Sequence, residues 1–415
     1  MQLTTIVTGA LALALRIPLY SALIGILLGN VLGGILMALH SAQGPHMPAP
    51  QMVLTRAQFG LFGNTLPTAV FTLMYIGFYS TTSVIGGQIL SQFFHLPYGL
   101  ALVCINAFTI VLVYVGDQVV RTFQRYSAFV FLLTFFYLTL HLWTRSHVFS
   151  VSPFSLSIPA VLEMAGVAIT WQVSYTPYVS DYSRRLHPDS PMWKLVLYSG
   201  MGTMLSTTWM MGLGATAAWS GVANDEIGNG TFLLIQVPKF LHVPMDLVFL
   251  LGIVVVNSFN LYGSFMSSKA LFPGIRHQGR RQRLVNVVAL ALLCTGISLW
   301  GQNNFLMKYS AFLSYLLYFL IPWSAISLVD FYGVSKAEYS IDSLLWKSSG
   351  QSRFHWETLT VYIISLLLEF IAMAVSHWFS WGHTVSSLAW AIGFLSSSLL
   401  YLVSINFAQQ RRFLR

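Results

Sequence analysis

Long apolar stretches alternate with short polar connections along the whole chain. Stretches of about 20 apolar residues are long enough to cross a bilayer as helices. Eleven such stretches lie near residues 18–40, 65–92, 98–116, 126–144, 159–182, 193–219, 244–268, 284–300, 305–330, 358–376 and 385–406. A shorter apolar segment at 1–15 has no basic leading region, so it favours a truncated helix over a cleaved signal peptide. The pattern therefore predicts an all-α polytopic membrane protein with about 12 transmembrane helices, the first one truncated.

One predicted helix carries both polar residues and a proline. The stretch 159–182 contains Gln172 and Tyr175 shortly before Pro177. Because proline lacks a backbone donor and clashes with the preceding turn, the helix is expected to break between Val173 and Tyr175. In hydrocarbon, polar side chains and freed backbone groups need partners, so they usually face a cavity or another helix. The segment therefore predicts a ligand site inside the membrane.

Two further apolar stretches contain residues suited to binding a planar ring. Phe78 and Thr82 are four residues apart, so they share one helical face and could stack on a ring and bond its edge. Asn257 and Asn260 are one turn apart, and each side-chain amide offers both donors and an acceptor. Aromatic core packing for the first pair and hydrogen bonds between helices for the second remain the structural alternatives.

Glu163 and Glu369 are acidic residues within apolar stretches, where we expect them to be buried. Glu163 precedes Thr170 and Ser174 by about two and three turns on nearly the same helical face. A carboxyl group kept from water favours its neutral form, which suits a proton carrier. Glu163 is therefore the candidate for proton coupling, although a neutral, hydrogen-bonded structural role fits either residue equally well.

Composition and charge placement agree with an integral membrane protein. The 415 residues are 56% hydrophobic and 8% charged, with a net charge of +9. If the N-terminus is cytoplasmic, 17 of the 21 basic residues fall on the inner side, as the positive-inside rule requires. The basic run at 275–283 then serves as a topology signal, and nucleic acid is not expected as a partner. We expect a plasma (cell inner) membrane protein with both termini in the cytoplasm.

Neither catalytic nor metal-binding patterns occur in the sequence. Cys104 and Cys294 lie in apolar stretches without CxxC or Cys/His spacing, and no catalytic triad order, P-loop or dinucleotide glycine pattern is found. The longest polar connections, 41–64, 220–243 and 331–357, are too short to form a separate soluble domain. We therefore expect a single transmembrane domain over 1–415, no enzyme activity, no metal and no cofactor.

Five segments of the chain can be compared with known families: SAQGPHMPAPQMVLTRAQFG at 41–60, GFYSTTSVIGGQ at 77–88, YTPYVSDYSRRL at 175–186, NSFNLYGSFMS at 257–267 and IPWSAISLVDFYGVSKAEYSIDSLL at 321–345. In this order they resemble the nucleobase:cation symporter-1 family, purine-cytosine permease branch. The resemblance implies a LeuT-like fold with two inverted five-helix repeats in 1–330 and two additional helices in 358–406. A cytoplasmic loop at 331–357 and a cytoplasmic tail at 407–415 complete this organisation.

The resemblance also implies a substrate site near the bilayer midplane. Aromatic residues on the third and sixth helices would sandwich the substrate ring, and amide or hydroxyl groups would bond its edge. By position these roles fall to Phe78, Thr82, Gln172, Ser174, Tyr175, Asn257 and Asn260. Val255 and Val256 stand where sodium-coupled relatives have hydroxyl ligands, and valine cannot bind a hard cation, so a proton is favoured over sodium.

The function implied is secondary active import of a nucleobase, cytosine or a purine, by proton symport through alternating access. A permease for another nitrogen heterocycle, such as allantoin, hydantoin, thiamine or a pyridoxine-like ring, is the nearest alternative. A channel is the alternative from another class, and it would need a continuous polar stripe or charged rings, which these helices lack.

Overall fold

The computed structural model describes residues 2–47, 49–115, 117–145, 154–220, 233, 237–271, 280–335, 353–378 and 382–413. Within these ranges the regular structure is helical and contains no strand. Most of the predicted loop 331–357 and of the basic run 275–283 lies outside the described residues.

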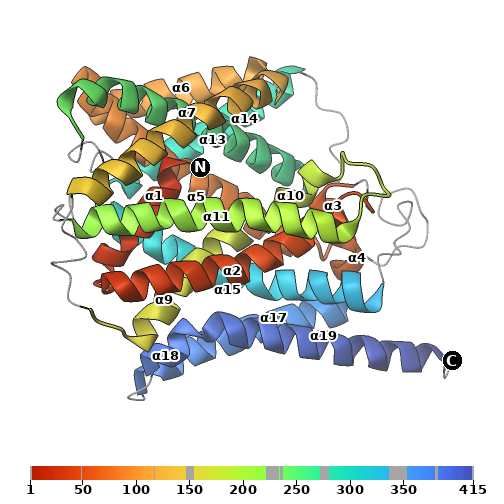
Figure 1. The fold of residues 1–415 in the computed structure, drawn as a ribbon. Helices are drawn as coiled ribbons and strands as arrows, with labels where there is room; N and C mark the ends of the chain where they lie inside the picture. The colour runs from red at the N-terminus through yellow and green to blue at the C-terminus, as the bar shows by residue number, and fades with distance from the viewer. Residues whose placement is uncertain are drawn as a thin grey trace. The chain divides into compact units, whose positions relative to one another are not determined.

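The long helices follow the predicted spans closely (Figure 1). They are α1 (Leu3–Ala14), α2 (Leu19–Gln43), α5 (Thr65–Phe94), α6 (Tyr98–Val115), α7 (Asp117–Arg145), α9 (Ile158–Val173), α11 (Met192–Trp219), α13 (His242–Leu271), α14 (Arg280–Gly301), α15 (Phe305–Val329), α17 (Trp356–Val375) and α19 (Ala389–Phe413). Shorter pieces are α3 (Gln51–Leu54), α4 (Arg56–Phe59), α10 (Thr176–Ser183), α18 (Gly382–Ser387), η2 (Lys239–Leu241), η3 (Asp330–Val334) and η4 (Ser376–Trp378).

Length and hydropathy single out eight of the described helices as candidate membrane spans. Two further apolar helices are shorter, α1 and α6. The predicted span 159–182 is divided between α9 and α10, and α11 covers the predicted span 193–219. The all-α polytopic class expected from the sequence is therefore confirmed, and the first helix is short, as predicted.

The chain forms two compact units that interleave along the sequence. Unit 1 comprises Met1–Ile26, Thr72–Met164 and Leu205–Phe312, and unit 2 comprises Leu27–Phe71, Ala165–Met204 and Leu313–Arg415. The two units are described separately below.

In unit 1, glycines allow helices to approach with their backbones in contact. A Cβ atom added at Gly9 of α1 would overlap the Met211 carbonyl of α11, and one at Gly214 would overlap the Ile6 carbonyl. Thr8 of α1 also shares a 2.7 Å hydrogen bond with the Tyr309 hydroxyl of α15. These close contacts fix α1 against α11 and against the first part of α15.

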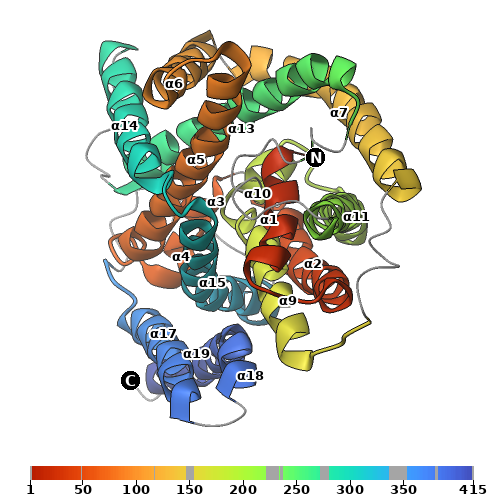
Figure 2. The same cartoon turned by 90° about the vertical axis from the view of Figure 1, so that its left-hand side faces the viewer.

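A second group in unit 1 consists of α5, α6, α13 and α14, which lie beside one another in Figure 2. Its core contains Tyr79 of α5, Val113 of α6, Leu261 of α13 and Cys294 of α14, all buried. Cys294 is thus a core residue, whereas Cys104 is exposed.

In unit 2, α2 packs on α9 through two glycines. A Cβ atom at Gly29 would overlap the Ala165 carbonyl, and one at Gly33 would lie 2.8 Å from the Gln172 Cβ atom. Small residues spaced four positions apart let two helix backbones approach closely in this way. The other helix pair of unit 2, α17 and α19, runs side by side (Figures 1 and 2).

Candidate substrate-binding site

The helix break predicted from Pro177 is present in unit 2. Helix α9 ends at Val173, Tyr175 is the N-cap of α10, and Pro177 lies in the first turn of α10. A proline at the start of a helix costs no hydrogen bond, because the first backbone N–H groups have no partner within the helix. The sequence therefore restarts the helix directly after interrupting it.

Hydroxyl groups around the break bond backbone carbonyls in the last turn of α9. Thr176 donates to the Val173 carbonyl at 2.6 Å. Ser174 donates to the Thr170 carbonyl at 2.7 Å and to the Trp171 carbonyl at 2.9 Å. The Ser174 hydroxyl proton is thus engaged by its own helix, and a role for Ser174 in substrate binding stays a prediction.

Gln172 and Tyr175 flank the break in different environments. Gln172 is fully buried and donates from Nε2 to the Asn30 Oδ1 atom of α2 at 3.0 Å. Tyr175 is half-buried, and its ring meets the Trp171 ring edge-on with centroids 6.1 Å apart. Tyr178 contacts the same tyrosine at 5.4 Å between centroids. Unit 2 therefore holds an aromatic group and an oriented amide at the interrupted helix.

The ring-binding candidates of α5 belong to unit 1. Phe78 is half-buried and packs edge-on against Phe312 of α15, with centroids 5.3 Å apart and planes at 82°. Thr82 is buried one turn further along α5. Because Phe78 is in unit 1 and Tyr175 in unit 2, a sandwich formed by these two rings stays a prediction.

Asn257 of α13 is the most constrained candidate of unit 1. Its side chain is fully buried, and its Nδ2 atom donates to Ser83 Oγ of α5 at 2.8 Å. Its Oδ1 atom is buried and has no hydrogen-bond partner among the described residues. Asn260, one turn later, is 9% exposed. The nitrogen of Asn257 thus forms the hydrogen bond between helices that the structural alternative predicted, whereas its oxygen forms none among the described residues.

The expectation that Glu163 is buried is wrong. The side chain is exposed in unit 1, where Glu163 lies in the second turn of α9. Glu369 of α17 is the acid that is fully buried in unit 2, where its carboxyl group lies against Gly393 of α19. Neither carboxyl oxygen of Glu369 has a hydrogen-bond partner among the described residues.

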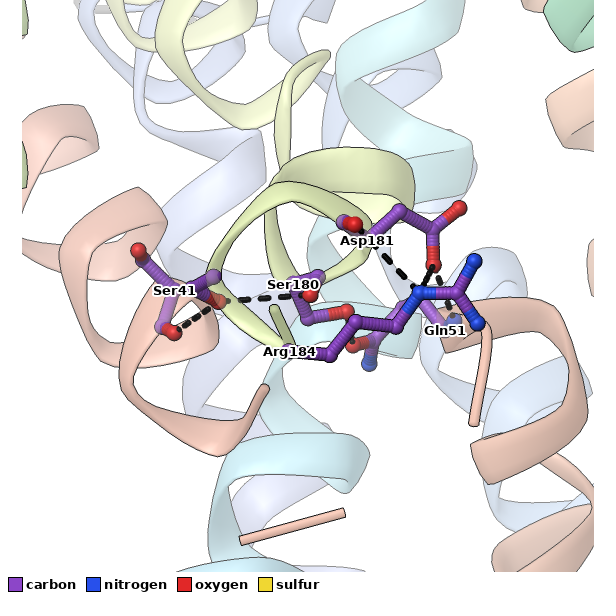
Figure 3. A network of polar contacts seen from close by, with 6 residues as sticks. Ser41, Gln51, Ser180, Asp181 and Arg184 are labelled. Carbon is purple, nitrogen blue, oxygen red and sulfur yellow. Dashed lines mark hydrogen bonds and ion pairs between the residues drawn. The ribbon is translucent and has the colours of Figure 1, made fainter. Parts of the chain in front are cut away.

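A polar network of unit 2 ties the end of α10 to α2 and α3 (Figure 3). Gln51 of α3 accepts from the Ser180 hydroxyl at 2.6 Å and donates through its backbone N–H to Asp181 Oδ1 at 3.1 Å. Arg184 lies 4.0 Å from the same carboxylate oxygen, and Ser183 donates to the Ser41 carbonyl at 2.6 Å. These contacts hold the second part of the interrupted helix in place.

A bundle of apolar helices with one interrupted helix and buried amides beside it defines the class of membrane transporters. The chain belongs to the family of permeases for cytosine/purines, uracil, thiamine and allantoin, whose family model matches residues 1–394. The expectation of a permease family rather than an enzyme is therefore confirmed.

Individual relatives agree with this assignment. The chain is 32% identical to YxlA of Bacillus subtilis (strain 168), a protein named as a candidate purine-cytosine permease, over 97% of this chain and 89% of the relative. The fold is similar to that of Mhp1, a nucleobase-cation-symport-1 family transporter, in a closed conformation with bromovinylhydantoin bound. That match has a TM-score of 0.77 and 14% identity, and covers 99% of this chain and 90% of Mhp1.

Other conformations and other transporters share the fold. Inward-facing Mhp1 matches with a TM-score of 0.73 and 15% identity, over 99% of this chain and 88% of Mhp1. An outward-open Na⁺-coupled sialic acid symporter matches with a TM-score of 0.60 and 10% identity, over 97% of this chain and 89% of the symporter. The LeuT-like fold expected from the sequence is thus confirmed. The chain is a multi-pass membrane protein of the permease family named above.

Sequence reasoning missed several residues that position the candidates. Asn30 orients Gln172, and Ser83 orients Asn257. Ser83 in turn donates to Asn106 of α6 at 2.8 Å. The available signal was polarity, because an asparagine within an apolar span is uncommon enough to be examined by itself.

Proposed function

We propose that this protein imports a small planar nucleobase, cytosine or a purine, together with a proton. The ring stacks between Phe78 and Tyr175, and its edge is hydrogen-bonded by Gln172 and Asn257, with Thr82, Ser174 and Asn260 as further polar groups. Stacking and edge hydrogen bonds each contribute on the order of 1 kcal/mol. The observation that carries the proposal is the fully buried amide of Asn257, whose oxygen has no partner among the described residues.

The family and the named relative support the choice of substrate. The family description names cytosine/purines first, and YxlA is named for purine-cytosine permeases. Uptake of labelled cytosine, adenine and hypoxanthine into cells that lack their own nucleobase permeases tests the proposal. We expect saturable uptake of at least one of these bases, and competition by the unlabelled base. Absence of saturable uptake of every base, in cells whose membranes contain the protein, would refute it.

A hydantoin-like ring is the second candidate substrate. Mhp1, which shares the fold, has been described with bromovinylhydantoin bound. Hydantoins, allantoin, thiamine and pyridoxine are therefore included as competitors in the uptake assay. Stronger competition by a hydantoin than by any nucleobase would favour this second candidate.

Proton coupling is proposed because Val255 and Val256 of α13 offer no side-chain oxygen for sodium. We propose Glu163 as the proton carrier, and its side chain is exposed at the surface of the protein. Uptake by the wild type is then abolished by a protonophore and unaffected by replacing sodium with choline. Glu163→Gln is expected to lose the dependence on the proton gradient. A variant that keeps this dependence would exclude Glu163, and uptake that follows sodium would exclude proton coupling.

We also propose that the protein lies in the plasma (cell inner) membrane with both termini in the cytoplasm. The distribution of basic residues in the sequence supports this orientation. Labelling of single cysteines placed near each terminus from one side of the membrane is the corresponding test.

A further inference from the structure

Asn257 is one end of a hydrogen-bond chain that passes through four helices of unit 1. Asn257 Nδ2 donates to Ser83 Oγ at 2.8 Å, and Ser83 Oγ donates to Asn106 Oδ1 at 2.8 Å. Asn106 Nδ2 donates to Thr295 Oγ1 at 2.8 Å. Thr295 Oγ1 donates to the Ala291 carbonyl, one turn earlier in α14, at 2.7 Å. The chain thus connects α13, α5, α6 and α14, in that order.

The end in α14 sets the direction of every bond in this chain. The Ala291 carbonyl can only accept, so the single hydroxyl proton of Thr295 is used there. Thr295 must then accept from Asn106, which turns the oxygen of Asn106 towards Ser83. Ser83 gives its single proton to that oxygen and must accept from Asn257. The nitrogen of Asn257 is therefore directed to Ser83, and its oxygen is the atom of the amide that has no partner among the described residues.

Reversing the Asn257 amide alone would place its oxygen against a hydroxyl oxygen that has no proton to give. Two acceptors would then face each other, and one buried hydrogen bond would be lost. Reversing the whole chain would instead detach Thr295 from the Ala291 carbonyl. The network therefore opposes both changes.

Helix packing alone does not require this arrangement. Ser80, one turn before Ser83 on α5, donates to the Cys294 carbonyl of α14 at 3.3 Å. Ser298 donates to the Ser80 carbonyl at 3.0 Å. These bonds join α5 to α14 and end on backbone carbonyls, whereas the chain through Asn257 ends on a fully buried amide oxygen without a partner among the described residues.

We propose that Asn257 Oδ1 accepts a hydrogen bond from a ring N–H or an amino group of the substrate, and that Ser83, Asn106 and Thr295 are positioning residues that fix this polarity. The inference rests on the proposed function, and it names a chemical feature by which the site distinguishes nucleobases: a donor at the edge that faces Asn257 Oδ1.

Ligand analogues that lose one donor or one acceptor test the proposal. Adenine is compared with purine, which lacks the amino donor, and with N-methylated adenines, which lack single N–H donors. Deaza-adenines lose single ring acceptors. Inhibition constants are measured on the wild type and on Asn257→Leu, which keeps similar bulk so that methyl groups gain no space. Cytosine and its N-methyl and deaza analogues form the second series.

Removal of one particular donor is expected to weaken binding to the wild type about tenfold or more, and to Asn257→Leu about twofold or less. Removal of ring acceptors should have the same effect on both proteins. If a deaza analogue, which lacks a ring acceptor, instead loses affinity for the wild type but not for Asn257→Leu, Asn257 presents its nitrogen to the substrate. The proposal would then be wrong. If no analogue distinguishes the two proteins, Asn257 does not bind the substrate.

The positioning residues are tested by one ratio: the inhibition constant of an analogue that lacks the donor divided by that of the analogue that has it. Ser83→Ala and Thr295→Val are expected to reduce the discrimination between donor-bearing and donor-free analogues, because each lets an amide of the chain turn. Ser80→Ala is the matched control on α5, and it should keep the ratio of the wild type. Equal ratios in all three variants, or an equal loss in Ser80→Ala, would overturn the positioning role.

Failure of the proposed function would be recognised separately. A protein that binds hydantoins but no nucleobase refutes nucleobase import, and N-methylhydantoins then test the same acceptor in the same way. A protein that discriminates nucleobases by an acceptor position refutes this inference but not nucleobase import. If none of these heterocycles binds to folded protein, both proposals fail.

Discussion

Gln51 and Asn257 are both buried carboxamides, yet their hydrogen bonding differs. In unit 2, both side-chain polar atoms of Gln51 are bonded, Oε1 to Ser180 and Nε2 to Gln43, and its backbone N–H donates to Asp181. In unit 1, Asn257 is bonded through its nitrogen but has no partner for its oxygen among the described residues. A paired amide joins helices, whereas an amide with an unpaired acceptor is prepared for a ligand.

The cost of leaving a buried acceptor unpaired supports this distinction. An unsatisfied buried polar group costs about 1–3 kcal/mol, and the large majority of buried side-chain polar atoms have at least one partner. A protein that keeps such a group in a membrane span is expected to use it. The difference between Gln51 and Asn257 therefore predicts opposite effects of substitution on binding and on stability.

The largest effect is expected for Asn257→Ala, on transport. Loss of a buried hydrogen bond to the substrate should weaken its affinity about tenfold to a hundredfold, which corresponds to about 1–3 kcal/mol. The measurement is the KM of saturable nucleobase uptake, normalised to the amount of folded protein in the membrane.

Ser258→Ala is the matched control for that substitution. Ser258 is the next residue of α13, is also buried, and donates to the Val254 carbonyl of its own helix. Its KM should stay within about twofold of the wild type, since a back-bonded hydroxyl contributes little. If the KM of Asn257→Ala is close to that of Ser258→Ala, Asn257 does not bind the substrate.

A third amide, Gln172, is expected to respond to Gly33→Ala. An added Cβ atom would lie 2.8 Å from the Gln172 Cβ atom and 2.9 Å from the Ile169 Cα atom, so α2 and α9 must separate. Overpacking of this kind costs about 1–3 kcal/mol. The thermal unfolding temperature of the purified protein should fall, and uptake should weaken because the amide beside the helix break moves.

Gly202→Ala provides the control for the glycine substitution. Gly202 is in α11 of the same unit, and a Cβ atom there would have no neighbour within 4 Å. This variant should be as stable as the wild type or slightly more stable, because alanine has the better helix propensity. If Gly33→Ala is equally stable, the helices tolerate more separation than their contacts indicate.

The smallest effect on transport is expected for Gln51→Ala. Removing the side chain deletes two hydrogen bonds and leaves the Ser180 hydroxyl without its acceptor, so the free energy of unfolding should fall by about 2 kcal/mol. Uptake per folded molecule should keep the KM of the wild type. Ser199→Ala, which removes a hydroxyl bonded to the Leu195 carbonyl of its own helix, should change neither quantity.

The sequence was sufficient for those parts of the fold that depend on local chemistry. Apolar length predicted the spans, and Pro177 predicted the break, because a missing backbone donor acts on its own helix wherever that helix lies. Helix α7 begins at Asp117, earlier than the predicted 126, because polar residues can continue a helix beyond its apolar stretch. The closeness of Gly29 and Gly33 to α9 could also be expected from their spacing.

The candidate site depended on contacts that no single helix reveals. Periodicity placed Glu163 on the same face as Thr170, but the burial of a side chain depends on which helices pack beside it, and the Glu163 side chain is exposed. The chain from Asn257 through Ser83 and Asn106 brings together residues of three helices that are far apart in sequence. The direction of the hydrogen bonds in this chain follows from the bond of Thr295 to the Ala291 carbonyl in α14. The sequence of α13 alone could not predict that direction.

The most direct test compares how ligand binding changes the thermal unfolding of three purified proteins. The wild type, Asn257→Ala and Gln51→Ala are heated with and without saturating adenine or cytosine. A ligand that binds only the folded state raises the unfolding temperature. We predict that a base concentration that just saturates the wild type raises it equally in the wild type and in the less stable Gln51→Ala, and much less in Asn257→Ala. A full rise in Asn257→Ala, or its loss in Gln51→Ala, would contradict the assignment of Asn257 to binding and Gln51 to structure.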